Sequence, residues 1–254
     1  MVCTIRQPLK WCKDHDVVPA ASEKGVLKYL PIGIGAVIPP WNFPFAILAG
    51  MTTAAWLTGN TVILKPSSDS TTIAYRYMEI LEEAGLPNGV VNFLPGPGSS
   101  IGSKMVTDAR TRFISFTGSM EVGLNINENA AKMSPGQIWI KRVVAEMGGK
   151  DAILVDETAD IEDAAQGIVS AAYGFQGQKC SACSRLIVHE DVHDELMEKI
   201  ITLTKKIKIG HPENKETQLG AVINKTAYKD ILNYIEIGKE EGDLVCGGDA
   251  IGDN

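Results

Sequence analysis

Residues 61–94 read TVILKPSSDSTTIAYRYMEILEEAGLPNGVVNFL, and this stretch decides the fold class. Its two ends, residues 61–64 and 90–94, are short apolar runs rich in β-branched side chains, which predict buried strands. Between them, residues 70–84 carry apolar side chains at helical spacing, and Gly85 follows as a stop signal. A strand, a helix and a second strand in this order predict a βαβ unit within a parallel sheet.

The same alternation of strands and helices continues on both sides of this stretch. Further strands are predicted over residues 26–38 (interrupted by Pro31 and two glycines), 112–116, 143–149, 151–155, 185–189 and 244–246. Further helices are predicted over residues 45–57, 120–132, 161–174, 192–209 and 228–240, with a short one after residue 102. We therefore expect an α/β fold built on a parallel sheet.

Composition and charge exclude several classes of protein. A chain of 254 residues with 44% hydrophobic residues is long enough to bury a sizeable core. The net charge of −7 does not favour a nucleic-acid partner, and the longest apolar stretch, residues 43–57, is too short and too polar for a membrane span. Five scattered cysteines argue against a disulfide framework. We expect an intracellular, cytoplasmic protein that binds neither nucleic acid nor membranes.

Cys180 is the first candidate for chemistry. It lies in the loop sequence GQKCSACSR, beside Lys179 and three residues before Cys183. A loop thiol near a cation can be activated as a nucleophile. The residues alone leave open an inert thiol, a metal half-site or a redox pair, although the chain offers no second pair of ligands at metal spacing. No metal is expected.

Glu146 and Asn42 are the next candidates. Glu146 comes at the end of an apolar strand, next to glycines, where a carboxylate could face a cleft and act as a general base. The alternative is an ordinary solvated glutamate. Asn42 lies in PPWNFP, where three prolines could hold its amide still for oxyanion stabilisation, although Asn is also a suitable helix N-cap.

Two turns that follow predicted strands could bind a dinucleotide. They are Lys65-Pro66-Ser67-Ser68 and Phe116-Thr117-Gly118-Ser119. Turns of this kind present backbone N–H groups and a helix N-terminus to phosphate. The G-x-G-x-x-G fingerprint is missing, since Gly96, Gly98 and Gly102 depart from it, so a standard Rossmann motif is not supported.

Six segments together resemble the aldehyde dehydrogenase superfamily in their order and approximate spacing. They are PPWNFPF (39–45), GNTVILKPS (59–67), AGLPNGVVNFLPG (84–96), FISFTGSMEVG (113–123), AEMGGKDAILV (145–155) and GQKCSACSR (177–185). The Trp-x-Lys-Arg run at residues 139–142 and the cysteine loop resemble one branch, the dehydrogenases of 1-pyrroline-5-carboxylate (glutamate semialdehyde), of proline and arginine catabolism. The resemblance implies a Rossmann-like NAD(P)-binding domain in residues 1–147 and the start of an α/β catalytic domain in residues 148–254.

The resemblance also implies roles for the three candidates. Cys180 would attack the aldehyde carbon, and Asn42 with the backbone N–H of Cys180 would hold the oxyanion. Hydride would pass to the cofactor and leave a thioester, which Glu146 would hydrolyse by activating water. Under this reading Cys183 is a loop residue.

Binding residues follow from the resemblance in the same way. For the cofactor they are Pro40, Trp41, Lys65 at the adenosine ribose, Ser68, Gly118 and Ser119 at the pyrophosphate, and Val122 beside the adenine. Ser68 stands where relatives strict for NAD often carry glutamate, so we expect NADP to be tolerated beside NAD. For the substrate, Phe43 and Ser181 would line the pocket.

The chain also departs from the family pattern. The family's longer N-terminal part is missing, and so are the Glu-x-Phe-Gly-Pro segment and the later loop that anchors the substrate. We therefore expect the middle of such an enzyme, incomplete at both ends, with homo-oligomer formation by the full-length protein. The alternatives are a truncated relative that binds a nucleotide or a partner without turnover, and another branch such as succinate-semialdehyde dehydrogenase.

Overall fold

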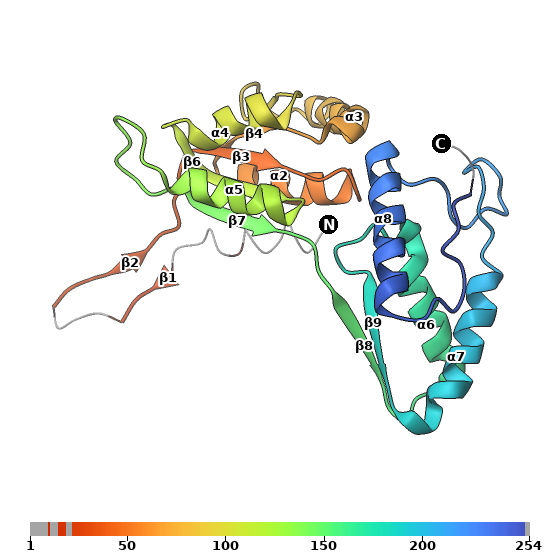
Figure 1. Ribbon diagram of the computed structural model, residues 1–254. Coiled ribbons are helices and arrows are strands. Elements are labelled where there is room, and N and C mark those ends of the chain that lie inside the picture. The colour runs from red at the N-terminus through yellow and green to blue at the C-terminus, as the bar shows by residue number, and fades with distance from the viewer. Residues whose placement is uncertain (1–9, 11–14, 19–21, 252–254) are drawn as a thin grey trace. The chain divides into compact units, whose positions relative to one another are not determined.

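The computed structural model describes residue 10, residues 15–18 and residues 22–251, which divide into two compact units, Met1–Met147 and Gly148–Asn254 (Figure 1). The elements of the first unit are β1 His15–Asp16, β2 Val26–Leu27, β3 Ile34–Ile38, α2 Ala46–Leu57, β4 Thr61–Leu64, η1 Ser68–Ser70, α3 Thr71–Glu83, β5 Val91–Phe93, η2 Gly98–Gly102, α4 Ser103–Thr107, β6 Thr111–Thr117, α5 Met120–Ala131 and β7 Arg142–Glu146. Those of the second unit are β8 Asp151–Val155, α6 Ile161–Tyr173, η3 Gly174–Gly177, β9 Cys183–Val188, α7 Glu190–Lys205 and α8 Lys225–Glu241.

A five-stranded parallel sheet forms the centre of the first unit. Its strand order is β5-β4-β3-β6-β7, and every neighbouring pair runs parallel. The chain moves outward from β3 to β4 and β5 on one side, then crosses back to β6 and β7 on the other. The predicted α/β class with a parallel sheet is confirmed, and β4, α3 and β5 form the βαβ unit expected from residues 61–94.

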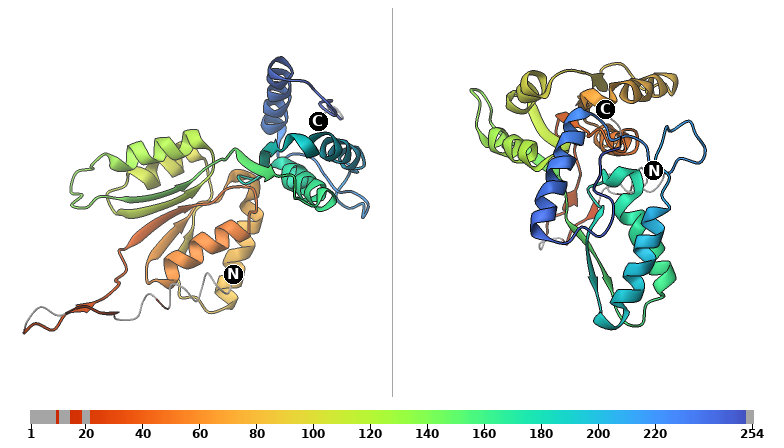
Figure 2. Two further views of the ribbon diagram at one scale, coloured as in Figure 1. Left: turned by 90° about the horizontal axis from the view of Figure 1, so that it is seen from below. Right: turned by 45° about the vertical axis from the view of Figure 1, so that its right-hand side comes forward.

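Helices lie on both faces of this sheet, and side chains alternate between the two faces along each strand. The edge strand β7 is the exception in burial, with Val144 67% exposed. Val37 packs with α2 and α3 in one core, whereas Ala36 and Ile38 pack with α4 and α5 in the other. Figure 2, left, shows the strands between the orange and gold helices on one side and the yellow and green helices on the other. Burial on both faces explains why the strands read as continuous apolar runs.

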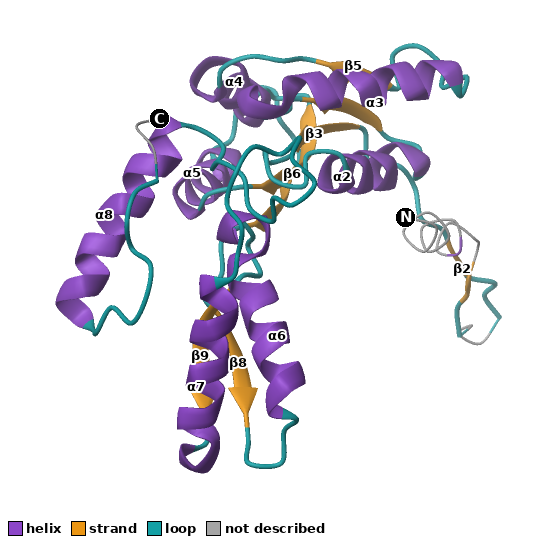
Figure 3. Ribbon diagram, turned by 90° about the vertical axis from the view of Figure 1, so that its right-hand side faces the viewer, coloured by secondary structure: helices purple, strands orange, loops and turns teal. Residues whose placement is uncertain are grey.

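The second unit has a smaller sheet with one covered face. β8 and β9 pair in parallel, and α6 and α7 pack on them around a core that includes Val155 and Leu196 (Figure 3). Leu154 and Ile187 are direct neighbours across the two strands and are 75% and 55% exposed. Among the described residues of the second unit, none forms a layer over this face of the two strands.

Three sequence predictions need correction. The interrupted strand predicted over residues 26–38 is divided near the expected place, where Gly33 has φ 122°, but its first part, β2, pairs with β1 in a separate antiparallel ribbon and does not join the parallel sheet. The helix predicted to end at residue 209 ends at Lys205, where the next backbone N–H closes a turn onto Leu203 O. Residues 244–246 form no strand, because none of the described strands pairs with them.

In the described part of the chain, we find no helix that has both the length and the apolar character needed to cross a bilayer.

Candidate active site

The carboxyl ends of the parallel strands bring five predicted residues of the first unit to one edge of the sheet. Asn42 follows β3, Lys65 follows β4, Gly118 and Ser119 follow β6, and Glu146 ends β7. β3 and β6 are neighbours although β4 and β5 come between them in the sequence, so the topological switch point falls there. In open α/β sheets, ligands bind in the crevice outside such a point.

A cavity of about 790 Å³ lies over this edge of the sheet, between α4 and α5. We call it the α4–α5 cavity. Its lining residues are Ile38, Lys65, Gly98, Ser99, Gly102, Ser103, Val106, Thr107, Glu121, Val122, Leu124, Asn125, Ile126, Glu128 and Asn129. Two predicted cofactor residues, Lys65 and Val122, thus line one cavity.

Lys65 is held in place by backbone carbonyls. Its side chain is nearly buried, with the residue 6% exposed, and its Nζ donates to Pro66 O at 2.9 Å and Gly96 O at 3.2 Å. Burial lowers the pKa of Lys65 from its ordinary value. A buried amine with carbonyl partners beside a cavity is suited to donate hydrogen bonds to ligand hydroxyl groups.

Gly118 and Ser119 form the turn between β6 and α5. The Gly118 N–H donates to Glu146 O at 3.0 Å, and a Cβ at Gly118 would lie 2.5 Å from Cζ of Phe116. Ser119 caps α5, its Oγ accepting from the Val122 N–H at 3.3 Å. Neither residue lines the cavity, but the first turn of α5, which follows them, contains two residues that do, Glu121 and Val122.

Asn42 lies in a turn with a strained backbone. The residue is half-buried, and the next residue, Phe43, has a φ of 45°. Positive φ at a bulky residue is costly and is found mainly at functional sites. The alternative role of Asn42 as helix N-cap is wrong, because α2 starts after Phe45, which makes no side-chain capping bond.

Glu146 is the last residue of β7, paired with Thr117 of β6. Its side chain is exposed, while its backbone carbonyl accepts from Gly118. An exposed carboxylate at the carboxyl end of a parallel strand can reach a water molecule or a ligand outside the sheet.

The loop that carries Cys180 belongs to the second unit and begins with backbone strain. Phe175 and Gln176 both have φ 57°, and Gly177 follows with φ 67°. Left-handed conformations at two successive non-glycine residues cost energy and occur mainly where a loop is shaped for function. The half-buried Cys180 follows this strained stretch.

Bonds within the second unit hold this loop. Lys179 Nζ donates to Ser170 O, near the end of α6, at 3.3 Å. The Ile223 N–H donates to Oε1 of Gln178 at 2.9 Å. Cys183, expected in the loop, is instead the first residue of β9, and it is a free thiol, as Cys180 is. Among the residues that the structure describes, no group of His, Cys, Asp or Glu side chains could hold a metal ion.

The other predicted residues lie outside the α4–α5 cavity. Pro40 is buried and Trp41 half-buried in the Asn42 turn, whereas Ser68 is exposed at the start of η1. Phe43 and Ser181 are exposed, in the first and second unit respectively. Sequence reasoning missed the polar lining residues of α5, because the positions of Glu121 and Asn125 signal only an exposed helix face.

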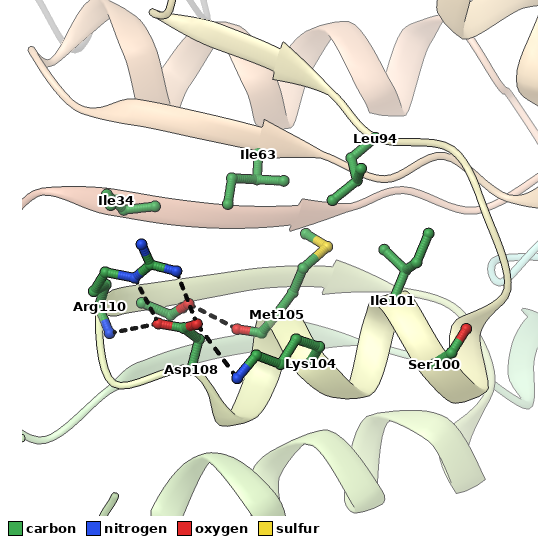
Figure 4. Close-up of a pocket in the computed structure, with 10 residues that line it drawn as sticks. Ile34, Ile63, Leu94, Ser100, Ile101, Lys104, Met105, Asp108 and Arg110 are labelled. Carbon is green, nitrogen blue, oxygen red and sulfur yellow. Dashed lines mark hydrogen bonds and ion pairs between the residues drawn. The ribbon is translucent and has the colours of Figure 1, made fainter. Parts of the chain in front are cut away.

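A second cavity, of about 520 Å³, opens on another face of α4, and we call it the α4–β5 cavity (Figure 4). Its walls are mostly apolar and include Ile63 and Leu94. At its rim Asp108 accepts from Arg110 Nε at 3.0 Å and lies 3.6 Å from Lys104 Nζ. The hydrogen bonds from Arg110 hold the pKa of Asp108 well below its usual range. No predicted site residue lines this cavity.

The fold and the arrangement at the strand ends define a class of protein. The sequence profile of the aldehyde dehydrogenase family matches residues 5–254, so the chain belongs to this family.

Within the family, the chain is similar to proteins named 1-pyrroline-5-carboxylate dehydrogenase. It is 56% identical to that of Anoxybacillus flavithermus and 54% identical to that of Bacillus cytotoxicus, in each case over 96% of this chain and 47% of the relative. The solved structure of the Thermus 1-pyrroline-5-carboxylate dehydrogenase with bound NAD matches with a TM-score of 0.93 and 47% identity, over 98% of this chain and 48% of that one. The chain thus spans about half the length of the curated relatives it matches.

Proposed function

We propose that this chain carries the reacting residues of an NAD(P)-dependent aldehyde dehydrogenase that oxidises L-glutamate 5-semialdehyde, the open form of 1-pyrroline-5-carboxylate, to L-glutamate. The observation that carries the proposal is the family match over residues 5–254, together with relatives of that name at more than half identity. The α4–α5 cavity at the switch point supports a nucleotide as cofactor, since dinucleotides bind at this place in α/β sheets.

In the proposed reaction, the Cys180 thiolate attacks the aldehyde carbon and forms a thiohemiacetal. The amide of Asn42 and the backbone N–H of Cys180 stabilise the negative charge on the former carbonyl oxygen. When bound, the dinucleotide would be the oxidant, accepting the hydride from the thiohemiacetal carbon, which becomes the carbonyl carbon of a thioester. Glu146 then takes a proton from water, which attacks the resulting thioester, and the products are the carboxylate and the free thiol.

The cofactor site would use residues at the carboxyl edge of the first sheet. Lys65 would donate to the hydroxyl groups of the adenosine ribose, and Val122 would lie against the adenine. Gly118 and Ser119 would lie by the pyrophosphate, where the start of α5 favours negative charge. Val122 is 47% exposed, so an apolar ring could cover it.

Ser68 supports tolerance of NADP, because a small neutral side chain does not repel a 2′-phosphate. Matched kinetics with NAD and NADP test this part of the proposal. We expect turnover with both cofactors, and complete rejection of NADP would contradict it.

The activity test compares single substitutions in the cysteine loop. NADH formation with glutamate semialdehyde is followed at 340 nm, in the way usual for such enzymes, for wild type, Cys180→Ala and Cys183→Ala. We expect Cys180→Ala to abolish the reaction, because the alanine side chain cannot form the thioester, and Cys183→Ala to retain most of it. A rate that Cys180→Ala leaves unchanged would end the proposal.

A second candidate function is nucleotide binding without turnover. It is favoured by the α4–α5 cavity, whose lining residues all belong to the first unit. Binding of ADP-ribose to a chain that forms no NADH would support this candidate over the enzyme. Faster turnover of succinate semialdehyde than of glutamate semialdehyde would instead indicate that the chain belongs to another branch of the family.

A further inference from the structure

The short helix α4, Ser103–Thr107, is tied at its C-terminal end by side chains from other segments. Met105 O accepts from Thr111 Oγ at 2.7 Å, and Val106 O accepts from Lys141 Nζ at 2.8 Å. α4 continues the helical turns of η2, Gly98–Gly102, and the last carbonyls of a helix have no partner within it. These bonds supply the missing partners.

The remaining end carbonyls of α4 are also satisfied. Thr107 O accepts from Ser134 Oγ at 2.8 Å, and Lys104 O accepts from the Asp108 N–H at 3.0 Å. The end of α4 is therefore bonded to residues that come from three later parts of the chain.

Lys141 is the charged member of this group, and it is nearly buried, with the residue 5% exposed. Removing an ammonium group from water is costly, and this burial lowers the pKa of Lys141. The bond to Val106 O offsets part of the cost, because a cation at a helix C-terminus interacts favourably with the aligned peptide dipoles.

The segment that delivers Lys141 is itself anchored. Trp139 Nε1 donates to Thr111 O at 3.2 Å, and the Arg112 guanidinium lies 4.0 Å from the centre of the Trp139 ring. This is the Trp-x-Lys-Arg run, whose chemistry the proposed reaction does not use. Its indole and ammonium groups bind the two ends of the connection from α4 to β6.

α4 packs into the core of the first unit through Met105 and Val106, which are 4% and 3% exposed, and two of its faces also line cavities. Ser103, Val106 and Thr107 line the α4–α5 cavity, whereas Lys104 and Met105 line the α4–β5 cavity (Figure 4). With a cavity on each of two faces, the position of the helix depends on the bonds at its C-terminal end as well as on these core contacts.

We propose that Lys141 is a positioning residue for the nucleotide site: by binding Val106 O, it holds α4 at the distance from α5 that the α4–α5 cavity needs to accept the adenosine half of the cofactor. The proposal rests on the proposed function, because it takes this cavity as the nucleotide site. Val106 links Lys141 to the cavity, since its carbonyl accepts a hydrogen bond from Lys141 Nζ and the residue also lines the α4–α5 cavity.

The test measures the dissociation constant of 5′-AMP by calorimetry for the 254-residue chain and its Lys141→Met variant. Methionine keeps most of the apolar length of the side chain and removes the ammonium group. We expect binding to weaken roughly tenfold, the change that corresponds to the loss of one charge-assisted hydrogen bond. Lys104→Met is the matched control, because it removes an exposed lysine of the same helix, and it should change the constant less than about twofold.

Hydrogen exchange separates positioning from a general loss of stability. At a temperature well below unfolding, Lys141→Met should speed exchange in residues 97–108 and leave β3 and β4 protected. If Lys141→Met does not fold, Ser134→Ala removes the neighbouring bond to Thr107 O and should weaken AMP binding in the same direction.

The outcomes distinguish this proposal from the one on which it rests. A folded Lys141→Met variant, or a Ser134→Ala variant in its place, that binds AMP as the wild type does would overturn the positioning role and leave the nucleotide site intact. Failure of the wild-type chain to bind AMP would overturn the nucleotide site, and the positioning role with it.

Discussion

The two parallel sheets of this protein differ in how they are covered. The sheet of the first unit has helices on both faces and two cores, one on each side, although Val144 of its edge strand β7 is 67% exposed. β8 and β9 of the second unit have α6 and α7 on one face, while Leu154 and Ile187 are exposed on the other. The same kind of strand, a short run of apolar residues, is thus buried on both faces at β3 in the first unit and half-exposed at β8 in the second.

This difference shows what an apolar run in a sequence means. Such a run indicates that a strand can be buried on both faces, and the neighbouring elements decide whether it is. The residues DAILV of β8 are as apolar as TVIL of β4, yet Leu64 is completely buried and Leu154 is 75% exposed. Substitutions placed in pairs can test how far the two units differ.

The largest effect is expected from cavities in the two cores. Leu196→Ala in the second unit and Leu48→Ala in the first remove side chains that are 0% and 1% exposed. Each should lower the free energy of unfolding by about 2–5 kcal/mol, because the lost contacts leave a void.

Two spectroscopic probes show which unit each variant affects. All four tryptophans of the chain precede residue 148, so tryptophan fluorescence reports on the first unit, whereas far-ultraviolet circular dichroism reports on both. Leu196→Ala should shift the dichroism transition and spare the fluorescence midpoint, and Leu48→Ala should shift the fluorescence. Equal shifts of both probes in both variants would mean that the units unfold together.

A smaller effect is expected from overpacking the covered sheet. A Cβ at Gly35 in β3 would lie 2.0 Å from Cζ of Phe113, so the ring would have to move within the sheet. Gly35→Ala should cost about 1–3 kcal/mol of the free energy of unfolding, measured by urea denaturation. Gly50→Ala in α2 is the control, since a Cβ there meets no atom within 4 Å, and a loss as large as that of Gly35→Ala would refute the steric explanation.

A gain in stability is expected from the second unit. Gly167 lies on the exposed side of α6, and an added Cβ would meet nothing within 4 Å. Gly167→Ala should stabilise this unit by about 0.5–1 kcal/mol, because alanine loses less backbone entropy in a helix. A lower midpoint in thermal unfolding by circular dichroism would contradict this.

The smallest effect is expected on the exposed face of β8. Leu154→Thr should change the free energy of unfolding by no more than about 0.5 kcal/mol, because little apolar area is lost from the core. The neighbouring side chain of Val155 points to the core and is 6% exposed. Val155→Thr should therefore lower the free energy of unfolding by about 1–3 kcal/mol, because it buries a hydroxyl group. Similar losses in both variants would mean that the face of Leu154 is covered in solution.

Much of the fold could be predicted from local patterns. The order of β4, α3 and β5 could be predicted because the spacing of apolar residues changes from that of a strand to that of a helix and back. Gly85, with a φ of 79°, marks the end of the helix. Prediction failed where a boundary depends on distant partners. Residues 244–246 have strand-like side chains, but a strand also needs a neighbour, and none of the described strands is paired with them.

The candidate site shows the same division. The turns after the strands could be identified because glycine, proline and small polar residues follow apolar runs, and this placed Lys65, Gly118 and Ser119 correctly at strand ends. The polar cavity lining from α5 and the link from Lys141 to Val106 had no local signal. Both depend on how α4 and α5 lie against the sheet.

By itself, the sequence determined the alternation of strands and helices, the turns that punctuate it and the resemblance to a family, because periodicity, turn chemistry and motifs are properties of short stretches. The tertiary structure decided that β3 lies between β4 and β6, that the inner strands of the first sheet are covered on both faces, and that Lys65 and Val122 line one cavity. Those features come from contacts between residues far apart in the chain, which no short stretch of sequence records.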